Sequence, residues 1–245
     1  AIIPKETKYT VNTTDMPLMV LLEDQSRVLL DPGASISYLP GFSADRREVY
    51  LEGAAFFDIA RNARKPFMVY SNKTVIKVLG TSFKVKPDEQ AAELEVAVGT
   101  GKGQVYENRK MVKDSNVEKG IIITPNQRGV YNEKNREFRT TLVEQPRMLT
   151  GEPGRPAHTV RKQPVSESPA FIYKAATVDR VLQEMTDAYG IDIVVENEDI
   201  YNCEFTGDIS AMGLFEKLNV ITQAIKASYE IHEAKILVKG EGCSL

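Results

Sequence analysis

The residue types that most often carry out chemistry are sparse in this chain and stand far apart. Its two histidines are His158, in a proline-rich linker, and His232, in a C-terminal strand or its turn, and neither lies close to a cysteine. Zinc sites and general-base sites need several such groups brought together. These spacings therefore predict no metal site and no histidine-centred catalytic site, and a structural role is the simpler interpretation of both histidines.

The two cysteines, Cys203 and Cys243, leave two interpretations open. They form no Cys-x-x-Cys pair, and two thiolates alone cannot complete a four-ligand zinc site. They are either two buried thiols or one disulfide that fastens the C-terminal tail. A disulfide would require an oxidising compartment.

Two further patterns imitate functional motifs. Glu93 and Glu95 share one face of a predicted strand, as paired catalytic carboxylates could, but apolar residues fill the opposite face and a solvated polar face explains the pair better. The glycine-rich run 99–103 lacks the spacing of a phosphate-binding loop and is predicted to be a hairpin turn between two strands. No catalytic motif remains, so we expect neither an enzyme nor a cofactor.

Composition narrows the class of protein. The chain has 245 residues, enough for one large or two modest domains, and its 42% hydrophobic and 27% charged content is that of a globular protein. A net charge of −3 gives no basic surface for nucleic acid. No apolar run approaches the roughly 20 residues of a membrane helix. Any membrane segment is therefore expected to lie outside this sequence.

The first part of the chain carries the pattern of an all-β domain. Residues 1–14 are polar and are interpreted as a linker, and residues 15–149 hold short strands separated by Gly, Asn and Pro turns. This pattern fits a sandwich or a solenoid. Arg46 and Arg47 are interpreted as two neighbouring positive charges where a turn leads into a strand. The aromatic side chains fall mainly at inward positions, which favours a core over a ligand platform: Tyr38, Phe42, Phe56, Phe57, Phe67 and Phe83.

The second part changes character after a linker at 150–169, which is rich in proline and glycine. Residues 170–245 predict a small α+β domain with the order βαββαβ. Its first helix is expected to begin after Thr177 and to end at Gly190, and its second helix to be capped by Ser210. The fold class is therefore a mainly β N-terminal domain followed by a small α+β domain.

The strand-rich region also resembles a known family. Between about residues 19 and 106 the order and spacing are similar to the core signature of FecR-type proteins. Three runs carry this resemblance: Arg47-x-Val49-x-Leu51-x-Gly53-x-Ala55-Phe56-Phe57, Pro66-Phe67-x-Val69 and Val78-Leu79-Gly80-Thr81-x-Phe83-x-Val85.

The C-terminal part carries a second resemblance. Residues 170–243 are similar to the short N-terminal signalling domain of secretins and TonB-dependent transducers (an STN-like domain), in the version found at the C-terminus of FecR-like proteins from Bacteroidetes. The run Cys203-x-Phe205-x-Gly207 before the second helix, with Cys243 near the end, carries it.

Together the two resemblances imply the periplasmic region of an inner-membrane, single-pass anti-sigma regulator. Its cytoplasmic segment and membrane helix are absent from this sequence. Such a region would bind the periplasmic signalling domain of an outer-membrane TonB-dependent transporter and relay its state to an extracytoplasmic-function (ECF) sigma factor. The alternative is a secreted or periplasmic module that binds carbohydrate or cell wall.

A partner would then be expected to meet an exposed strand edge in the C-terminal domain. Strand addition supplies affinity from main-chain hydrogen bonds and specificity from alternate side chains. The candidate edge is the run Glu204, Phe205, Thr206, Gly207, Asp208 and Ile209.

Overall fold

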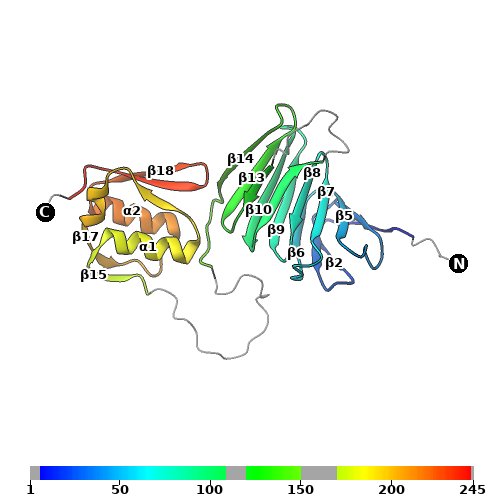
Figure 1. The fold of residues 1–245 in the computed structure, drawn as a ribbon, viewed down its shortest axis with the longest axis horizontal. Coiled ribbons are helices and arrows are strands. Elements are labelled where there is room, and N and C mark those ends of the chain that lie inside the picture. Colours follow the sequence, from blue (N-terminus) through cyan, green and yellow to red (C-terminus); the bar gives the residue numbers. More distant parts are fainter. Residues whose placement is uncertain (1–5, 109–119, 150–169, 244–245) are drawn as a thin grey trace, which may run out of the picture. The chain divides into compact units, whose positions relative to one another are not determined.

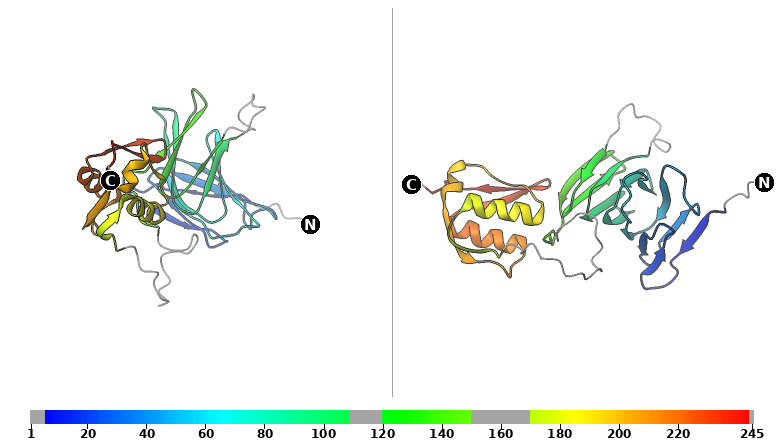
Figure 2. Two further views of the ribbon diagram at one scale, coloured as in Figure 1. Left: turned by 60° about the vertical axis from the view of Figure 1, so that its left-hand side comes forward. Right: turned by 60° about the horizontal axis from the view of Figure 1, so that its bottom comes forward.

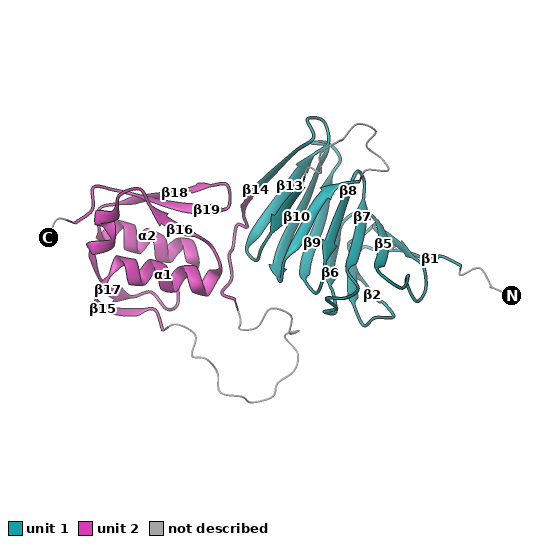
Figure 3. Cartoon of the chain, viewed as in Figure 1, with its two compact units in different colours: residues 1–140 teal, residues 141–245 magenta. Residues whose placement is uncertain are grey.

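The computed structural model describes residues 6–108, 120–149 and 170–243. The chain divides into two compact units, residues 1–140 and 141–245 (Figure 3). The first unit is built of strands and the second combines two helices with short strands, which confirms the expected fold class. Residues 141–149, which the sequence grouped with the first domain, belong to the second unit, where Leu149 N donates to Ala188 O at 2.7 Å.

Unit 1 contains two seven-stranded sheets, here called sheet A and sheet B (Figure 1). Sheet A has the order β1 (Lys8–Val11), β4 (Ser35–Tyr38), β5 (Arg47–Glu52), β7 (Phe67–Ser71), β8 (Thr74–Val78), β11 (Gly103–Glu107) and β12 (Gly120–Ile123). Sheet B has the order β14 (Glu137–Leu142), β13 (Gln127–Asn132), β10 (Glu93–Thr100), β9 (Ser82–Asp88), β6 (Ala55–Asp58), β3 (Arg27–Leu30) and β2 (Leu18–Leu21).

The chain passes repeatedly between the two sheets. Strands β5 and β7 are parallel neighbours in sheet A, and β6, which lies in sheet B, connects them. Parallel neighbours need such a crossover, because a tight turn can only join antiparallel strands. Inward-facing residues of both sheets form one core, so the two sheets pack together as the layers of a sandwich. Its fully buried members include Val49, Val69, Ile76, Phe57, Phe83 and Leu94.

Two details of unit 1 differ from the sequence interpretation. Residues 99–103 turn from β10 in sheet B to β11 in sheet A, so the glycine-rich run is a corner between sheets and not a hairpin turn. Phe56 points outward with 39% of its surface exposed, whereas Phe57 is completely buried. Successive side chains of a strand lie on opposite faces, so these two rings cannot both enter the core.

Arg47 is a buried residue and not half of a surface charge pair. Its side chain is only 2% exposed, and Nη1 donates to Asp24 Oδ2 at 2.6 Å and to Ala60 O at 2.9 Å. Nε donates to Lys65 O at 2.9 Å, and the guanidinium carbon lies 5.3 Å from the centroid of the Phe67 ring. One guanidinium therefore joins the β2–β3 turn to the loop between β6 and β7.

A second polar cluster joins the two sheets farther along unit 1. Glu107 of sheet A has a side chain only 3% exposed. It accepts a hydrogen bond from the hydroxyl of Tyr131 at 2.7 Å and from Nε and Nη2 of Arg136 at 2.9 and 2.8 Å. Burial, and then this carboxylate, raise the pKa of Tyr131, so the phenol stays protonated and continues to donate.

Unit 2 places two helices between two small sheets (Figures 1 and 2). One sheet has the order β15-β17 and the other β16-β19-β18. The observed order is βαββαββ, because the last β of the predicted order is a closing hairpin of two strands, β18 and β19. The elements are β15 (Ile172–Thr177), α1 (Val178–Tyr189), β16 (Ile193–Val195), the 3-10 helix η1 (Glu198–Asn202), β17 (Glu204–Asp208), α2 (Leu214–Ala224), β18 (Ser228–His232) and β19 (Lys235–Lys239).

The helix boundaries follow local signals only in part. Thr177 is the N-cap of α1, and Gly190 ends this helix with φ +64°, a left-handed conformation that favours glycine, as predicted. Helix α2 begins after Gly213, not at Ser210. The Glu216 carboxylate accepts a hydrogen bond from Gly213 N at 2.8 Å, while the Ser210 hydroxyl donates to Asp208 instead.

We expect Arg47→Met to lower the free energy of unfolding of the first unit by about 3 kcal/mol, because it removes one partner of a largely buried ion pair and leaves two carbonyl oxygens without a donor. Arg47→Lys keeps the charge but cannot reach all three acceptors, so its loss should be smaller. Urea unfolding followed by circular dichroism measures the effect, since the chain has no tryptophan.

Arg46→Met is the matched control. The Arg46 side chain is 49% exposed and pairs with Glu48 at 3.0 Å, and such surface pairs contribute less than about 1 kcal/mol. Equal losses for Arg46→Met and Arg47→Met would contradict the structural role of Arg47.

Candidate protein-binding edge

Strand β17 has one face buried and one face open. Phe205 is 2% exposed and Ile209, directly after the strand, is 1% exposed. Glu204, Thr206 and Asp208 are exposed between them. The structure thus places all six predicted edge residues in and just after one short strand, with alternate side chains available to a partner.

Within the described part of the chain, β17 pairs with a neighbour on one side only. It lies antiparallel to β15 in a two-stranded sheet. Ile209 N donates to Phe171 O at 3.0 Å, so the main-chain donor of Ile209 points toward the β15 side. Donor directions alternate along a strand. The main-chain groups of Glu204, Thr206 and Asp208 therefore point to the open side.

A β-bulge in β15 lies opposite the centre of this edge. Tyr173 is paired with Gly207 and Ala176 with Phe205, so β15 has one extra residue between these pairs. Ala175 has φ +47°, and its main-chain N–H donates to the Thr206 hydroxyl at 2.8 Å. Thr206 thus has two separate roles, because its hydroxyl fixes the bulge while its main chain faces outward.

Helix α1 supports the sheet from its buried side. The ring of Phe205 packs edge-on against Tyr173, with 6.0 Å between centroids, and the Tyr173 hydroxyl donates to Glu184 of α1 at 2.8 Å. Burial, and then the hydrogen bond to Glu184, raise the pKa of Tyr173, so this donor remains protonated. The edge is therefore held in one position before any partner arrives.

A disulfide lies at the beginning of the edge. Cys203, the residue before β17, is joined to Cys243, and Cys203 O also accepts a hydrogen bond from Val178 N at 2.8 Å, where α1 begins. The tail is held further by Asn197, whose Nδ2 donates to Glu241 O at 2.9 Å. The disulfide thus connects the C-terminal tail to the start of both α1 and β17.

A buried lysine lies at the other end of the edge. The ammonium group of Lys217 donates to Met212 O and to Ser210 O, the latter at 3.5 Å, and lies 4.7 Å from the centroid of the Phe171 ring. Burial lowers the pKa of this lysine. The sequence interpretation missed it, although its place on the apolar stripe of α2, beside Leu214 and Leu218, was a signal.

Asp208, the last residue of β17, places a charged group at the end of the edge. Its carboxylate accepts hydrogen bonds from Ser210 N at 3.0 Å and from the Ser210 hydroxyl at 2.6 Å. These hydrogen bonds hold the pKa of Asp208 below its usual range, so the group is ionised at neutral pH. With Glu204, it gives the open face of β17 two carboxylates.

The other groups that could carry chemistry are not brought together. Glu93 pairs with Arg139 at 2.7 Å and Glu95 with Arg128 at 3.5 Å, so cross-strand ion pairs account for both glutamates. His232 is exposed beside Glu230, and His158 lies outside the described residues. No group of three potential metal ligands occurs in the described ranges. No helix within these described ranges is long and apolar enough to cross a membrane.

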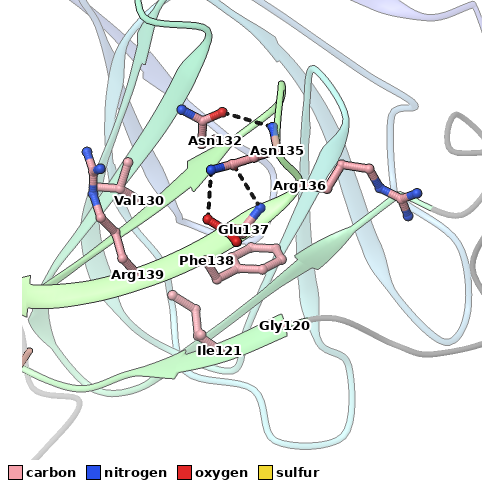
Figure 4. Close-up of a pocket in the computed structure, with 9 residues that line it drawn as sticks. All are labelled: Gly120, Ile121, Val130, Asn132, Asn135, Arg136, Glu137, Phe138 and Arg139. Carbon is pink, nitrogen blue, oxygen red and sulfur yellow. Dashed lines mark hydrogen bonds between the residues drawn. The ribbon is translucent and has the colours of Figure 1, made fainter.

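One open cleft of about 530 Å³ lies beside the turn between β13 and β14 (Figure 4). The polar side chains of its lining already have partners within unit 1. Asn135 N donates to Asn132 Oδ1 at 3.2 Å, and Asn135 Nδ2 donates to Glu137 Oε2 at 2.7 Å. The cleft lining contains no nucleophile with an adjacent base, so it does not suggest a catalytic site.

Comparison with known proteins gave two family matches. The model described as "FecR protein" matches residues 9–102, and the model described as "FecR, C-terminal" matches residues 170–238. Together these matches span about two-thirds of the chain, one in each unit. No curated protein matches the chain.

Two crystal structures of a candidate anti-sigma factor from Parabacteroides distasonis ATCC 8503 are similar to this chain at 23% sequence identity. The first, at 2.50 Å resolution, covers 98% of this chain and 100% of its own with a TM-score of 0.48. The second, at 1.65 Å resolution, covers 97% of this chain and 100% of its own with a TM-score of 0.47.

The double variant Cys203→Ala/Cys243→Ala is expected to lower the free energy of unfolding by about 2–4 kcal/mol, because it removes a cross-link between residues 40 positions apart and frees the unfolded chain. Urea unfolding without reductant measures the difference. Reductant should bring the wild type down to the stability of the variant and leave the variant unchanged. A wild type whose stability does not respond to reductant would contradict a stabilising disulfide.

Proposed function

This chain belongs to the FecR family of anti-sigma factor regulators, and we propose on that basis that it is the periplasmic sensor region of such a regulator. In this proposal it binds the periplasmic signalling domain of an outer-membrane TonB-dependent transporter. A membrane helix and a cytoplasmic segment outside this sequence would carry the state of that complex to an ECF sigma factor.

The open edge of β17 is the single observation that carries the binding proposal. A strand with one unpaired side presents main-chain donors and acceptors to any extended segment of a partner. Here the groups of Glu204, Thr206 and Asp208 take this position, and their side chains stand on the exposed face. A strand of the transporter domain placed beside β17 would satisfy these groups.

The contacts at both ends of β17 favour binding without a large conformational change in this chain. The Cys203–Cys243 disulfide holds the start of the strand, and Lys217 holds the loop that follows it. A preorganised edge loses less conformational entropy when a partner binds. A disulfide also fits the periplasm, which is an oxidising compartment.

The charges on β17 indicate which side chains to expect on the partner strand. Glu204 and Asp208 present two carboxylates on the exposed face of β17, so we expect Lys or Arg at the facing positions of the partner. The proposed role is non-enzymatic, in keeping with the family and with the scattered titratable groups.

A carbohydrate-binding module receives less support. That alternative needs the aromatic side chains in an open groove, but Phe57, Phe67 and Phe83 are completely buried. Phe57 and Phe83 stack with their centroids 5.0 Å apart inside the sandwich, so they fill the core of unit 1.

The test compares two substitutions at one residue. Thr206→Pro removes the outward main-chain donor and the hydroxyl, whereas Thr206→Val removes the hydroxyl alone. With the purified periplasmic signalling domain of a TonB-dependent transporter from the same organism, Thr206→Pro should weaken binding by at least about tenfold, the equivalent of about 1.4 kcal/mol. Thr206→Val should remain within about threefold of the wild type. Titration calorimetry measures both affinities.

Circular dichroism serves as the control for folding, because both variants lose the hydroxyl that accepts from Ala175. Unchanged binding by a folded Thr206→Pro variant would overturn the β17 edge as the contact site. No binding by the wild type would overturn the choice of partner.

A further inference from the structure

We propose that strand β2 in the first unit pairs with β2 of a second copy of this chain, which joins two copies of sheet B across a two-fold axis. This inference concerns a different unit from β17 and does not depend on the transporter. Its basis is the open edge of sheet B, which ends at β2 within the described residues (Figure 1).

Strand β2 carries few of the features that usually protect a sheet edge. It consists of Leu18, Met19, Val20 and Leu21, with no charge and no bulge, and its protection is limited to its short length and to Pro17, which directly precedes it. Met19 is 56% exposed and Leu21 is 68% exposed. The described end strands β1 and β14 differ, because they carry Lys8 and the pair Glu137 and Arg139. The remaining end strand of unit 1, β12, directly follows residues outside the described range.

The exposed apolar surface continues from β2 across the neighbouring strands of sheet B. Met19 lies opposite Leu29 of β3, and Leu29 lies opposite Phe56 of β6, so the three side chains form one row across the outer face of sheet B. Phe56 is the aromatic residue that the sequence placed inside. Contiguous exposed apolar surface of this kind is typical of contact sites.

The direction of the main-chain groups shows what β2 offers to a partner. Leu22 N donates to Ser26 O at 2.8 Å, toward β3. Because donors alternate along a strand, those of Leu18 and Val20 also point toward β3. The N–H and C=O groups of Met19 and Leu21 therefore point to the open edge, on the two residues whose side chains are also most exposed.

A second copy satisfies these groups in one particular register. If the two-fold axis passes beside Val20, then Met19 lies opposite Leu21 of the partner subunit, and Leu21 lies opposite Met19 of the partner subunit. Each of these two pairs exchanges both of its main-chain hydrogen bonds, so all outward donors and acceptors of Met19 and Leu21 are used. A shift by one residue would place outward side chains opposite inward ones.

Charge does not oppose this register. Continuing the pairing past the strand ends places Glu23 opposite Pro17 of the partner subunit, and no two like charges meet. The paired segment is short and makes few hydrogen bonds, so we expect a weak, reversible dimer with a dissociation constant on the order of 10–1,000 µM, in the range of small transient interfaces.

The first experiment is sedimentation velocity of this chain from about 10 µM to about 1 mM. The wild type should show reversible dimerisation, and Met19→Lys/Leu21→Lys should remain monomeric, because charges at both exposed positions would face an apolar partner strand. Leu79→Lys is the matched control, since Leu79 is also exposed, at 42%, but lies outside β2. A monomeric wild type at every concentration, or equal disruption by Leu79→Lys, would overturn the proposal.

The second experiment tests the register by oxidative cross-linking. Val20→Cys should cross-link to itself, because a directly opposite pair without main-chain hydrogen bonds has Cα atoms about 4.5 Å apart, within the reach of a disulfide. Met19→Cys alone should cross-link poorly, since two such residues would be about 8 Å apart, but a mixture with Leu21→Cys should cross-link well. Efficient self-cross-linking of Met19→Cys and none of Val20→Cys would overturn this register.

Discussion

Main-chain carbonyl groups that strands and helices leave unpaired need a donor, and in each unit a buried cation supplies one. Arg47 binds the carbonyl oxygens of Ala60 and Lys65 in unit 1, and Lys217 binds those of Ser210 and Met212 in unit 2. Leaving a buried polar group unpaired costs about 1–3 kcal/mol. The two cations therefore stabilise the loop between β6 and β7 and the segment that follows β17, and these loops position the adjacent strands.

The same requirement explains where partners can bind. Main-chain groups that are satisfied inside the molecule are unavailable, whereas the outward groups of β17 and β2 remain available at open edges. The two edges differ in chemistry. The exposed face of β17 carries Glu204 and Asp208, which favour a basic partner strand, while β2 carries only apolar side chains and favours a strand equally free of charge.

Much of the architecture could be predicted because period-two and period-3.6 patterns are local. They indicated the mainly β first domain, the helix between Thr177 and Gly190, and the edge strand around Thr206. The exchange of strands between two sheets could not be seen, because residues 99–103 look the same whether they join strands of one sheet or of two. The burial of Arg47 was also hidden, since Asp24 and Ala60 reach it only through tertiary folding.

Self-association through β2 would also change how β17 binds. A dimer joined through β2 does not use the main-chain groups of β17, because the two edges belong to different strands and different units. Two linked copies would bind with a higher apparent affinity than one copy where the two transporter domains are themselves held close together, because the second contact then becomes intramolecular. A weak β2 contact suits this role, since the dimer would form only where many copies are close together, and the response would depend on their local concentration.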